Sequence, residues 1–215
     1  SFYIAMEYCP YGDLRMCCMT ALPESYAKSI VKQVAKGLVF LHSSDILHRD
    51  VKPDNILVAK GPPIDTTIAV KIADFGVAKK VNSEQVEGTR ANSHAGTNGF
   101  MAPEVHMGAG DDYTFSCDIW SLGCVQFWLL TLAEKIPQNL KFKQILEEKG
   151  VSTEAVNFCL SLTEYHPGRR PTASEVLEDA WLRGFTEVPI TDRAQKAFMV
   201  GQGRKRSIMS QVECK

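Results

Sequence analysis

The stretch that decides the fold is HRDVKPDN, residues 48–55, which is followed at once by the apolar run Ile56-Leu57-Val58. Within it, Asp50, Lys52 and Asn55 place a carboxylate, a cation and an amide oxygen on one polar loop that leads into a predicted strand. Phosphoryl transfer needs a carboxylate to accept a hydroxyl proton, a cation to offset charge on the transferred group, and oxygen ligands for Mg²⁺. The loop is therefore the first candidate for a catalytic site.

A second carboxylate, Asp74, follows in the triplet Asp74-Phe75-Gly76. Two short β-like runs, 56–58 and 68–72, flank a Gly61-Pro62-Pro63 turn and predict a hairpin. Such a hairpin would bring Asp74 back towards the polar loop, where its carboxylate completes a metal site. Gly76 lets the backbone turn sharply after it.

The rest of the chain reads as mainly helical. Pro23-Glu24 opens a long helix, because apolar residues recur every four positions from Tyr26 to Leu38. A strongly apolar central helix is expected from Ile119 to Leu129, and further helices over about 141–149, 153–163 and 173–182. The polar, glycine-rich stretch 74–104 is predicted to be a long loop that is either functional or disordered. We therefore expect a mainly α domain with one small β-hairpin.

Composition excludes several classes of partner and compartment. The 215 residues carry a formal net charge of -1, which gives no basic field for nucleic acid. No apolar run approaches the roughly 20 residues that span a bilayer, so no membrane partner is expected. The seven cysteines include no CxxC pair, which favours reduced thiols in the cytoplasm or the nucleus.

Three motifs in this order resemble those of eukaryotic protein kinases. HRDVKPDN is similar to the catalytic loop, IADFG (72–76) to the metal loop, and MAPEV (101–105) to the end of the activation segment. Each motif alone is weak, but the three together are specific. The similarity continues in DIWSLG (118–123) and RRPT (169–172), and it covers about residues 1–183. It implies the C-terminal lobe of a kinase, which is part of an α+β domain when complete.

The resemblance also assigns roles. Asp50 resembles the catalytic base, Lys52 the residue that steadies the γ-phosphate, and Asn55 and Asp74 the Mg²⁺ ligands. Thr97 resembles the threonine that bridges the base and the lysine. ATP and Mg²⁺ are the implied cofactors. Lys52 is typical of the serine/threonine branch, so the implied substrates are serine and threonine hydroxyls of proteins. Taken singly, each residue is better interpreted as a solvated loop charge or a turn-capping side chain, and only the set together favours the functional roles.

Residues 1–13 resemble the last strand of the N-terminal lobe and the hinge, with a short strand expected over Phe2–Glu7. The resemblance also implies a brief helix after the hinge, at about 14–21. The resemblance places five residues around the nucleotide: Met6 as gatekeeper, Glu7 and Cys9 at the adenine edge, Asp13 near the ribose and Leu57 beneath the base. Ordinary core packing is the alternative for Met6 and Leu57, and both interpretations can hold together.

Four further matches concern structure and regulation. Glu104 and Arg170 resemble a buried ion pair, and Asp118 resembles the helix residue that hydrogen-bonds the catalytic-loop backbone. Arg49, just before the base, resembles the arginine of kinases that need an anion in the activation segment. Ser93 is the expected phosphate site for an upstream kinase, and Thr89 is the second choice.

Three parts of the kinase pattern are not found ahead of the hinge: the glycine-rich phosphate loop, the strand lysine and the helix glutamate. We therefore expect a chain without its N-terminal lobe, divided into strand and hinge (1–13), C-terminal lobe (14–185) and a partly disordered tail (186–215). The isolated chain is expected to bind Mg-ATP weakly and to transfer no phosphate. The alternative is a non-catalytic kinase-like lobe that acts as a protein-binding scaffold.

Overall fold

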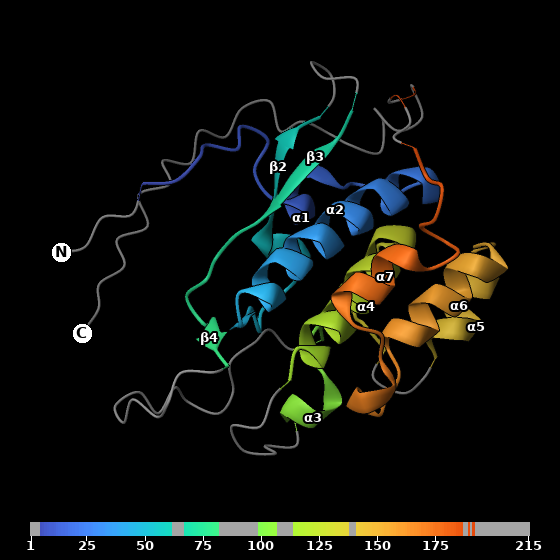
Figure 1. Cartoon of the computed structure of the whole chain (residues 1–215). Helices are drawn as coiled ribbons and strands as arrows, with labels where there is room; N and C mark the ends of the chain where they lie inside the picture. The colour runs from blue at the N-terminus through green and yellow to red at the C-terminus, as the bar shows by residue number, and fades with distance from the viewer. Residues whose placement is uncertain are drawn as a thin grey trace.

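The computed structural model describes residues 5–61, 67–81, 99–106, 114–137, 141–186, 189 and 191. Its helices are α1 (Leu14–Cys17), α2 (Glu24–Ser43), α3 (Pro103–His106), α4 (Ser116–Thr131), α5 (Phe142–Glu148), α6 (Thr153–Leu162) and α7 (Ala173–Glu178). Its strands are β1 (Ile46–Leu47), β2 (Ile56–Lys60), β3 (Ala69–Ile72) and β4 (Lys79–Lys80), with 3₁₀ turns η1 (Pro53–Asn55) and η2 (Pro167–Arg169). The helices form the body, and the β2–β3 hairpin lies along α2 (Figure 1). The predicted mainly α fold with a small hairpin is confirmed.

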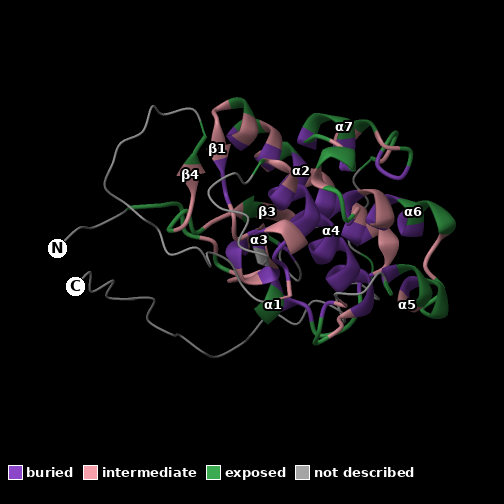
Figure 2. Cartoon of the chain, turned by 90° about the horizontal axis from the view of Figure 1, so that it is seen from below, coloured by how far each residue is buried: buried purple, intermediate pink, exposed green. Residues whose placement is uncertain are grey.

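The central helix is α4, as its apolar sequence predicts. Every residue from Cys117 to Thr131 is buried, because α2, α5 and α6 pack around it. A helix that is apolar on all sides has no solvent face and belongs in the middle of a core. Figure 2 shows this concentration of buried residues along α4, with the exposed residues at the periphery.

Helix α2 buries the stripe that its sequence predicts, from Tyr26 to Leu38. Its first residue, Glu24, accepts hydrogen bonds from the backbone nitrogen and hydroxyl of Ser152, both at 2.7 Å, and from Trp181 Nε1 at 3.2 Å. Burial raises the pKa of Glu24, but these hydrogen bonds outweigh burial and hold the pKa below its usual value. The charged carboxylate thereby joins the start of α2 to the cap of α6 and to the residues after α7.

Two small antiparallel pairings hold residues 46–61 and 67–80 against one another. Strand β2 pairs with β3 in the register Ile56↔Ile72, with a bulge between Val58 and Lys60. Strand β1 pairs with β4 through Leu47↔Lys79. In the sequence, the paired strands β1 and β4 lie on either side of the β2–β3 hairpin. The segment after β3 therefore returns to the loop that follows β1. The expected turn at Pro62-Pro63 lies outside the described residues.

Three sequence predictions differ from the structure in detail. Residues 5–9, the described end of the expected first strand and of the hinge, are irregular and pair with no described strand. Helix α1 ends at Cys17 instead of continuing to 21. Helix α7 ends at Glu178, because Asp179 is extended and its carboxylate accepts the backbone N–H of Trp181 at 2.8 Å. Local hydrogen bonding thus ended a helix that the apolar pattern would have continued.

No helix in the described part of the chain combines the length and the apolarity needed to cross a membrane.

Two helical glycines give a matched test of the packing. A Cβ at Gly123 of α4 would lie 2.7 Å from Thr163 Cγ2 and 2.8 Å from Leu162 Cβ. A Cβ at Gly37 of α2 would lie 2.7 Å from Ile72 Cδ1, which is the end of a side chain that can rotate away. Gly123→Ala should therefore destabilise the fold by about 1–3 kcal/mol.

For Gly37→Ala, the gain in helix propensity of about 1 kcal/mol should offset the contact with Ile72. Urea unfolding of both variants and of the unmodified chain measures the difference. Equal loss of stability in the two variants would contradict this account of the α4–α6 contact.

Candidate active site

Two of the three predicted catalytic-loop residues donate hydrogen bonds to one carboxylate oxygen of the third, Asp50. Asp50 Oδ2 accepts hydrogen bonds from Lys52 Nζ at 2.6 Å and from Asn55 Nδ2 at 2.9 Å. The same amide nitrogen of Asn55 also donates to the backbone oxygen of Asp50 at 2.8 Å. The side chains of Asp50 and Lys52 are 13% and 16% exposed, so this group is sheltered yet open to a substrate. Two donors thus fix the direction in which the Asp50 carboxylate points.

The hydrogen bonds of Asn55 also orient its amide. Since the nitrogen donates twice to Asp50, the amide oxygen is the atom that remains for a cation. Asn55 is buried at 7% exposure, and its position in η1 is set by Pro53, which begins the turn. An amide oxygen in this orientation fits a hard cation such as Mg²⁺.

Asp118 of α4 anchors the backbone of the catalytic loop by hydrogen bonds, as the resemblance predicts. Its Oδ2 accepts the N–H of His48 at 3.0 Å, and its Oδ1 accepts the N–H of Arg49 at 2.8 Å. Asp118 Oδ2 also accepts a hydrogen bond at 2.9 Å from Nε2 of His42, near the end of α2. Asp118 is fully buried, so each of these bonds replaces a lost contact with water.

The loop backbone is strained where Asp118 holds it. Arg49 has φ of 69° and Asp74 has φ of 64°, a left-handed conformation that non-glycine residues adopt rarely. Such a conformation costs on the order of 1–3 kcal/mol and persists only when neighbouring contacts impose it. For Arg49 those contacts are Asp118 on its N–H and the oxygen of Val77 on its Nε.

Asp74 is positioned through its neighbour Ala73. The N–H of Ala73 donates to the oxygen of Asn55 at 2.8 Å, and its carbonyl accepts from Nε2 of His48 at 3.0 Å. Phe75 packs edge-on against His48, with ring centroids 5.2 Å apart. The Asp74 side chain is exposed and caps its own turn by accepting the N–H of Gly76 at 3.2 Å. The backbone bond between Ala73 and Asn55 therefore places Asp74 directly after the residue that meets Asn55, its predicted partner in binding Mg²⁺.

The residues predicted to surround the nucleotide are brought together only in part. Asp13 and Leu57 form a β-bridge, which the bond from Val58 N–H to the oxygen of Gly12 reinforces at 2.8 Å. The Asp13 carboxylate caps α1 by accepting the N–H of Met16 at 2.8 Å. Leu57 is half-buried.

Of the other predicted positions, Met6 is 71% exposed, so the alternative of ordinary core packing is wrong for it. Glu7 is exposed and its carboxylate pairs with Lys71, while Cys9 is half-buried. Neither residue contacts the catalytic loop through a described side-chain interaction. Thr97, Ser93 and Thr89 lie outside the described residues.

The ion pair predicted between Glu104 and Arg170 is present. Arg170 Nη1 and Nη2 donate to the two carboxylate oxygens of Glu104 at 2.6 and 2.9 Å, and the Arg170 side chain is fully buried. Arg170 also donates to the oxygen of Ser116 at 3.0 Å and lies over the ring of Trp120, 4.9 Å from its centroid. The pair therefore ties α3 to the start of α4.

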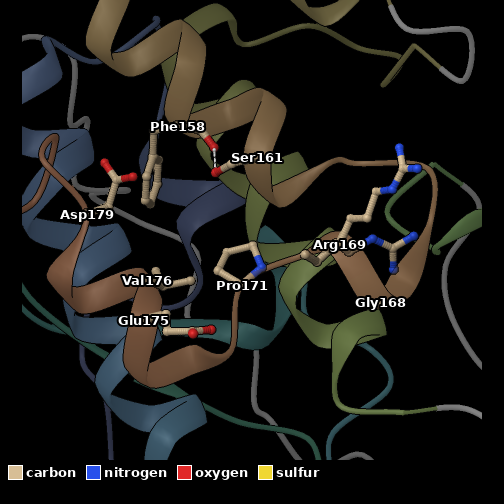
Figure 3. Close-up of a pocket in the computed structure, with 9 residues that line it drawn as sticks. Phe158, Ser161, Gly168, Arg169, Pro171, Glu175, Val176 and Asp179 are labelled. Atoms are coloured by element: carbon tan, nitrogen blue, oxygen red, sulfur yellow. Dashed lines mark hydrogen bonds between the residues drawn. The ribbon is translucent and has the colours of Figure 1, made fainter.

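A separate hollow of about 460 Å³ lies between α6, η2 and α7 (Figure 3). Its lining comes from these three elements and the residues next to them: Phe158, Ser161, Gly168, Arg169, Arg170, Pro171, Glu175, Val176 and Asp179. None of the predicted catalytic residues belongs to it, so it is distinct from the catalytic loop.

The sequence did not single out two residues that this site uses. His42 is the third donor to Asp118, although 76 positions separate them. Arg15 pairs with Asp54 of the catalytic loop across 39 positions. Both contacts are made across the fold, so no local spacing signals them.

The chain matches the family model described as "Protein kinase domain" over residues 1–182. It is 34% identical over 196 residues to mitogen-activated protein kinase kinase kinase 2 of Arabidopsis thaliana, which covers 84% of this chain and 28% of that protein. It is 32% identical over 210 residues to serine/threonine-protein kinase RAD53 of Saccharomyces cerevisiae, covering 85% and 24%.

Serine/threonine-protein kinase 33 of Mus musculus is 33% identical over 202 residues, covering 86% of this chain and 40% of that protein. The chain thus spans less than half the length of each of these relatives. Among solved structures, the crystal structure of the Rad53 kinase domain and SCD2 in complex with AMPPNP superposes with a TM-score of 0.66. It is 28% identical and covers 89% of this chain and 76% of that one.

Removing the Asp118 carboxylate tests its anchoring role. Asp118→Ala leaves the N–H groups of His48 and Arg49 and the ring of His42 without their acceptor, at about 1–3 kcal/mol for each buried group. We expect a loss of at least ~3 kcal/mol in urea unfolding. Glu147→Ala removes one partner of an exposed, 3.9 Å ion pair on α5 and should cost under ~1 kcal/mol. Similar losses in the two variants would rule out the anchor.

Proposed function

This chain belongs to the protein kinase family, and from that premise we propose that the full-length protein transfers the γ-phosphate of ATP to serine and threonine hydroxyls of proteins. The observation that carries the proposal is the convergence of Lys52 Nζ and Asn55 Nδ2 on Oδ2 of Asp50. The serine/threonine preference is supported by Lys52 and by the similarity to two serine/threonine-protein kinases.

In the proposed reaction the hydroxyl oxygen of the substrate bonds to the γ-phosphorus while the bond to the β–γ bridging oxygen breaks. The hydroxyl proton passes to the Asp50 carboxylate, whose direction Lys52 and Asn55 fix. The ammonium of Lys52 lies beside this carboxylate and offsets negative charge on the transferred group. Since positioning supplies most of the catalysis in phosphoryl transfer, the rigidity of this group is its main contribution.

We propose that Asn55, through its amide oxygen, and Asp74, through its carboxylate, hold Mg²⁺. When bound, this ion neutralises phosphate oxygens of ATP. Support comes from the orientation of the Asn55 amide and from the Asn55–Ala73 bond that brings Asp74 to the loop. Two protein ligands suit Mg²⁺, which keeps its remaining positions for phosphates and water. Thr97 is proposed to bridge Asp50 and Lys52.

The nucleoside is proposed to lie against the segment that begins at Met6. Asp13 would approach the ribose and Leu57 the base, and the bridge between them supports a common site. Glu7 and Cys9 would offer backbone groups to the adenine. The superposing Rad53 kinase domain was solved in complex with AMPPNP. We also propose action in the cytoplasm or the nucleus, since the described cysteines are all free.

Replacement of the base tests the proposed reaction. Asp50→Asn should lower turnover by roughly 10²–10⁴-fold in the full-length protein, because a neutral amide cannot accept the proton. The readout is transfer from radiolabelled ATP to a serine/threonine peptide library. Binding of Mg-ATP, measured by calorimetry, should change little in Asp50→Asn but should weaken in Asp74→Asn.

Glu147→Gln, on the exposed face of α5, is the control for loss of one negative charge. Near-normal turnover in Asp50→Asn would refute the role of Asp50. Mg-ATP binding without transfer in the unmodified protein would instead support the alternative of a non-catalytic scaffold.

We further propose that an upstream kinase phosphorylates Ser93, with Thr89 as second choice. The side chains of Arg49 and Lys79 would then bind this phosphate group. The Leu47↔Lys79 pairing and the Arg49–Val77 hydrogen bond place these two cations on adjoining segments. A phosphate brings nearly two negative charges at neutral pH and forms strong hydrogen bonds with such cations.

Phosphosite mapping of active protein should find Ser93 or Thr89. The Ser93→Ala, Thr89→Ala double variant should lose most of its activity, whereas full activity would exclude this mode of control.

A further inference from the structure

An arginine side chain occupies an acidic position beside the catalytic loop. Arg15 of α1 directs its Nε at Asp54, at 2.9 Å from both carboxylate oxygens. The guanidinium carbon lies 5.4 Å from the ring centroid of Trp128 and 5.9 Å from that of Phe100. The two rings are buried, whereas the side chains of Arg15 and Asp54 are 42% and 40% exposed. The ion pair is therefore a surface feature built over a rigid aromatic base.

This pair lies within reach of a peptide whose hydroxyl meets Asp50. Asp54 is four residues after Asp50, so their Cα atoms are at most about 14 Å apart. An extended peptide advances about 3.3 Å per residue and covers that distance in roughly four residues. A side chain within four positions of the acceptor hydroxyl can therefore reach Asp54.

A second carboxylate makes the position more acidic than Asp54 alone. Burial raises the pKa of Asp13 above its usual value, and the hydrogen bond from the Met16 N–H opposes this; the negative charge of Asp54 raises the pKa further and the charge of Arg15 lowers it. The three groups therefore interact electrostatically. Without Arg15, Asp13 and Asp54 would leave two carboxylates next to the catalytic loop, which is an environment that binds a cation.

We propose that Arg15 is a specificity-determining residue: its guanidinium occupies the position beside Asp54 that a basic residue of an acceptor peptide would otherwise take. The protein then accepts peptides that carry no arginine or lysine near the hydroxyl, and a peptide arginine gains nothing unless it displaces Arg15. This inference rests on the proposed function, because it assigns the substrate preference of the same site.

The contacts of Arg15 keep its side chain beside Asp54. They contribute little enough to stability that Arg15 can be substituted without unfolding the chain. A half-exposed ion pair contributes little to stability, and the two cation–π contacts add modestly. Methionine keeps the unbranched stem and a similar helix propensity, so Arg15→Met removes the charge and preserves α1. Lys36→Met, at an exposed position on α2, changes the net charge equally and serves as the control.

The test measures binding and transfer separately. The probes are fluorescein-labelled, alanine-based peptides with one serine and one arginine each. Across the set, the arginine occupies in turn each of the four positions on either side of the serine. Matched peptides with glutamine in place of arginine serve as the reference. By anisotropy at low salt, Arg15→Met should bind the best arginine peptide about tenfold more tightly than the unmodified protein does. Lys36→Met should not, and Asp54→Asn added to Arg15→Met should abolish the gain. Transfer to the same peptides should follow this order.

An unmodified protein that already binds the arginine peptide as tightly as Arg15→Met would overturn the inference. A gain that survives Asp54→Asn would overturn it as well. Absence of transfer to every peptide would count against the proposed function, while the binding comparison would still decide the role of Arg15.

Discussion

The carboxylate of Asp118 links the central helix to the loop that carries Asp50. A charged group at 0% exposure is costly unless donors replace its water, and here three donors do so. Two of them are consecutive backbone N–H groups, which fixes the peptide plane between His48 and Arg49. The left-handed conformation of Arg49 follows from this constraint. The direction of the next residue, Asp50, is thereby set by a side chain in the core.

The β2–β3 hairpin also fixes the positions of Asn55 and Asp74, the proposed metal ligands. Because Ile56 pairs with Ile72, Asn55 and Ala73 meet at the end of the ladder, and Asp74 comes next. A shift of one residue in this register would turn alternate side chains to the opposite face and separate Asn55 from Asp74. The ring of His48 reinforces the register by donating to the Ala73 carbonyl. Loop and hairpin therefore stabilise one another.

The sequence predicted those features that repeat locally or match a family motif. Periodicity located α2 and α4, and the Gly-Pro-Pro turn located the hairpin. The Glu104–Arg170 pair and the Asp118 anchor were predictable only through the resemblance, since 66 and 69 or more positions separate the partners. The contacts His42–Asp118 and Arg15–Asp54 had no such signal. The strand expected over Phe2–Glu7 was wrong for its described residues 5–7, because a strand depends on a partner and not on apolar sequence alone.

The two buried anchors, at Asp118 and at Arg170, also frame the segment between Ala73 and Glu104. At one end, Ala73 is held by Asn55 and His48. At the other, Glu104 is held by the fully buried guanidinium of Arg170. Fixing both ends of a chain segment removes much of the conformational entropy that ordering its middle would otherwise cost. The phosphate proposed at Ser93 would therefore act on a segment whose two ends are already fixed.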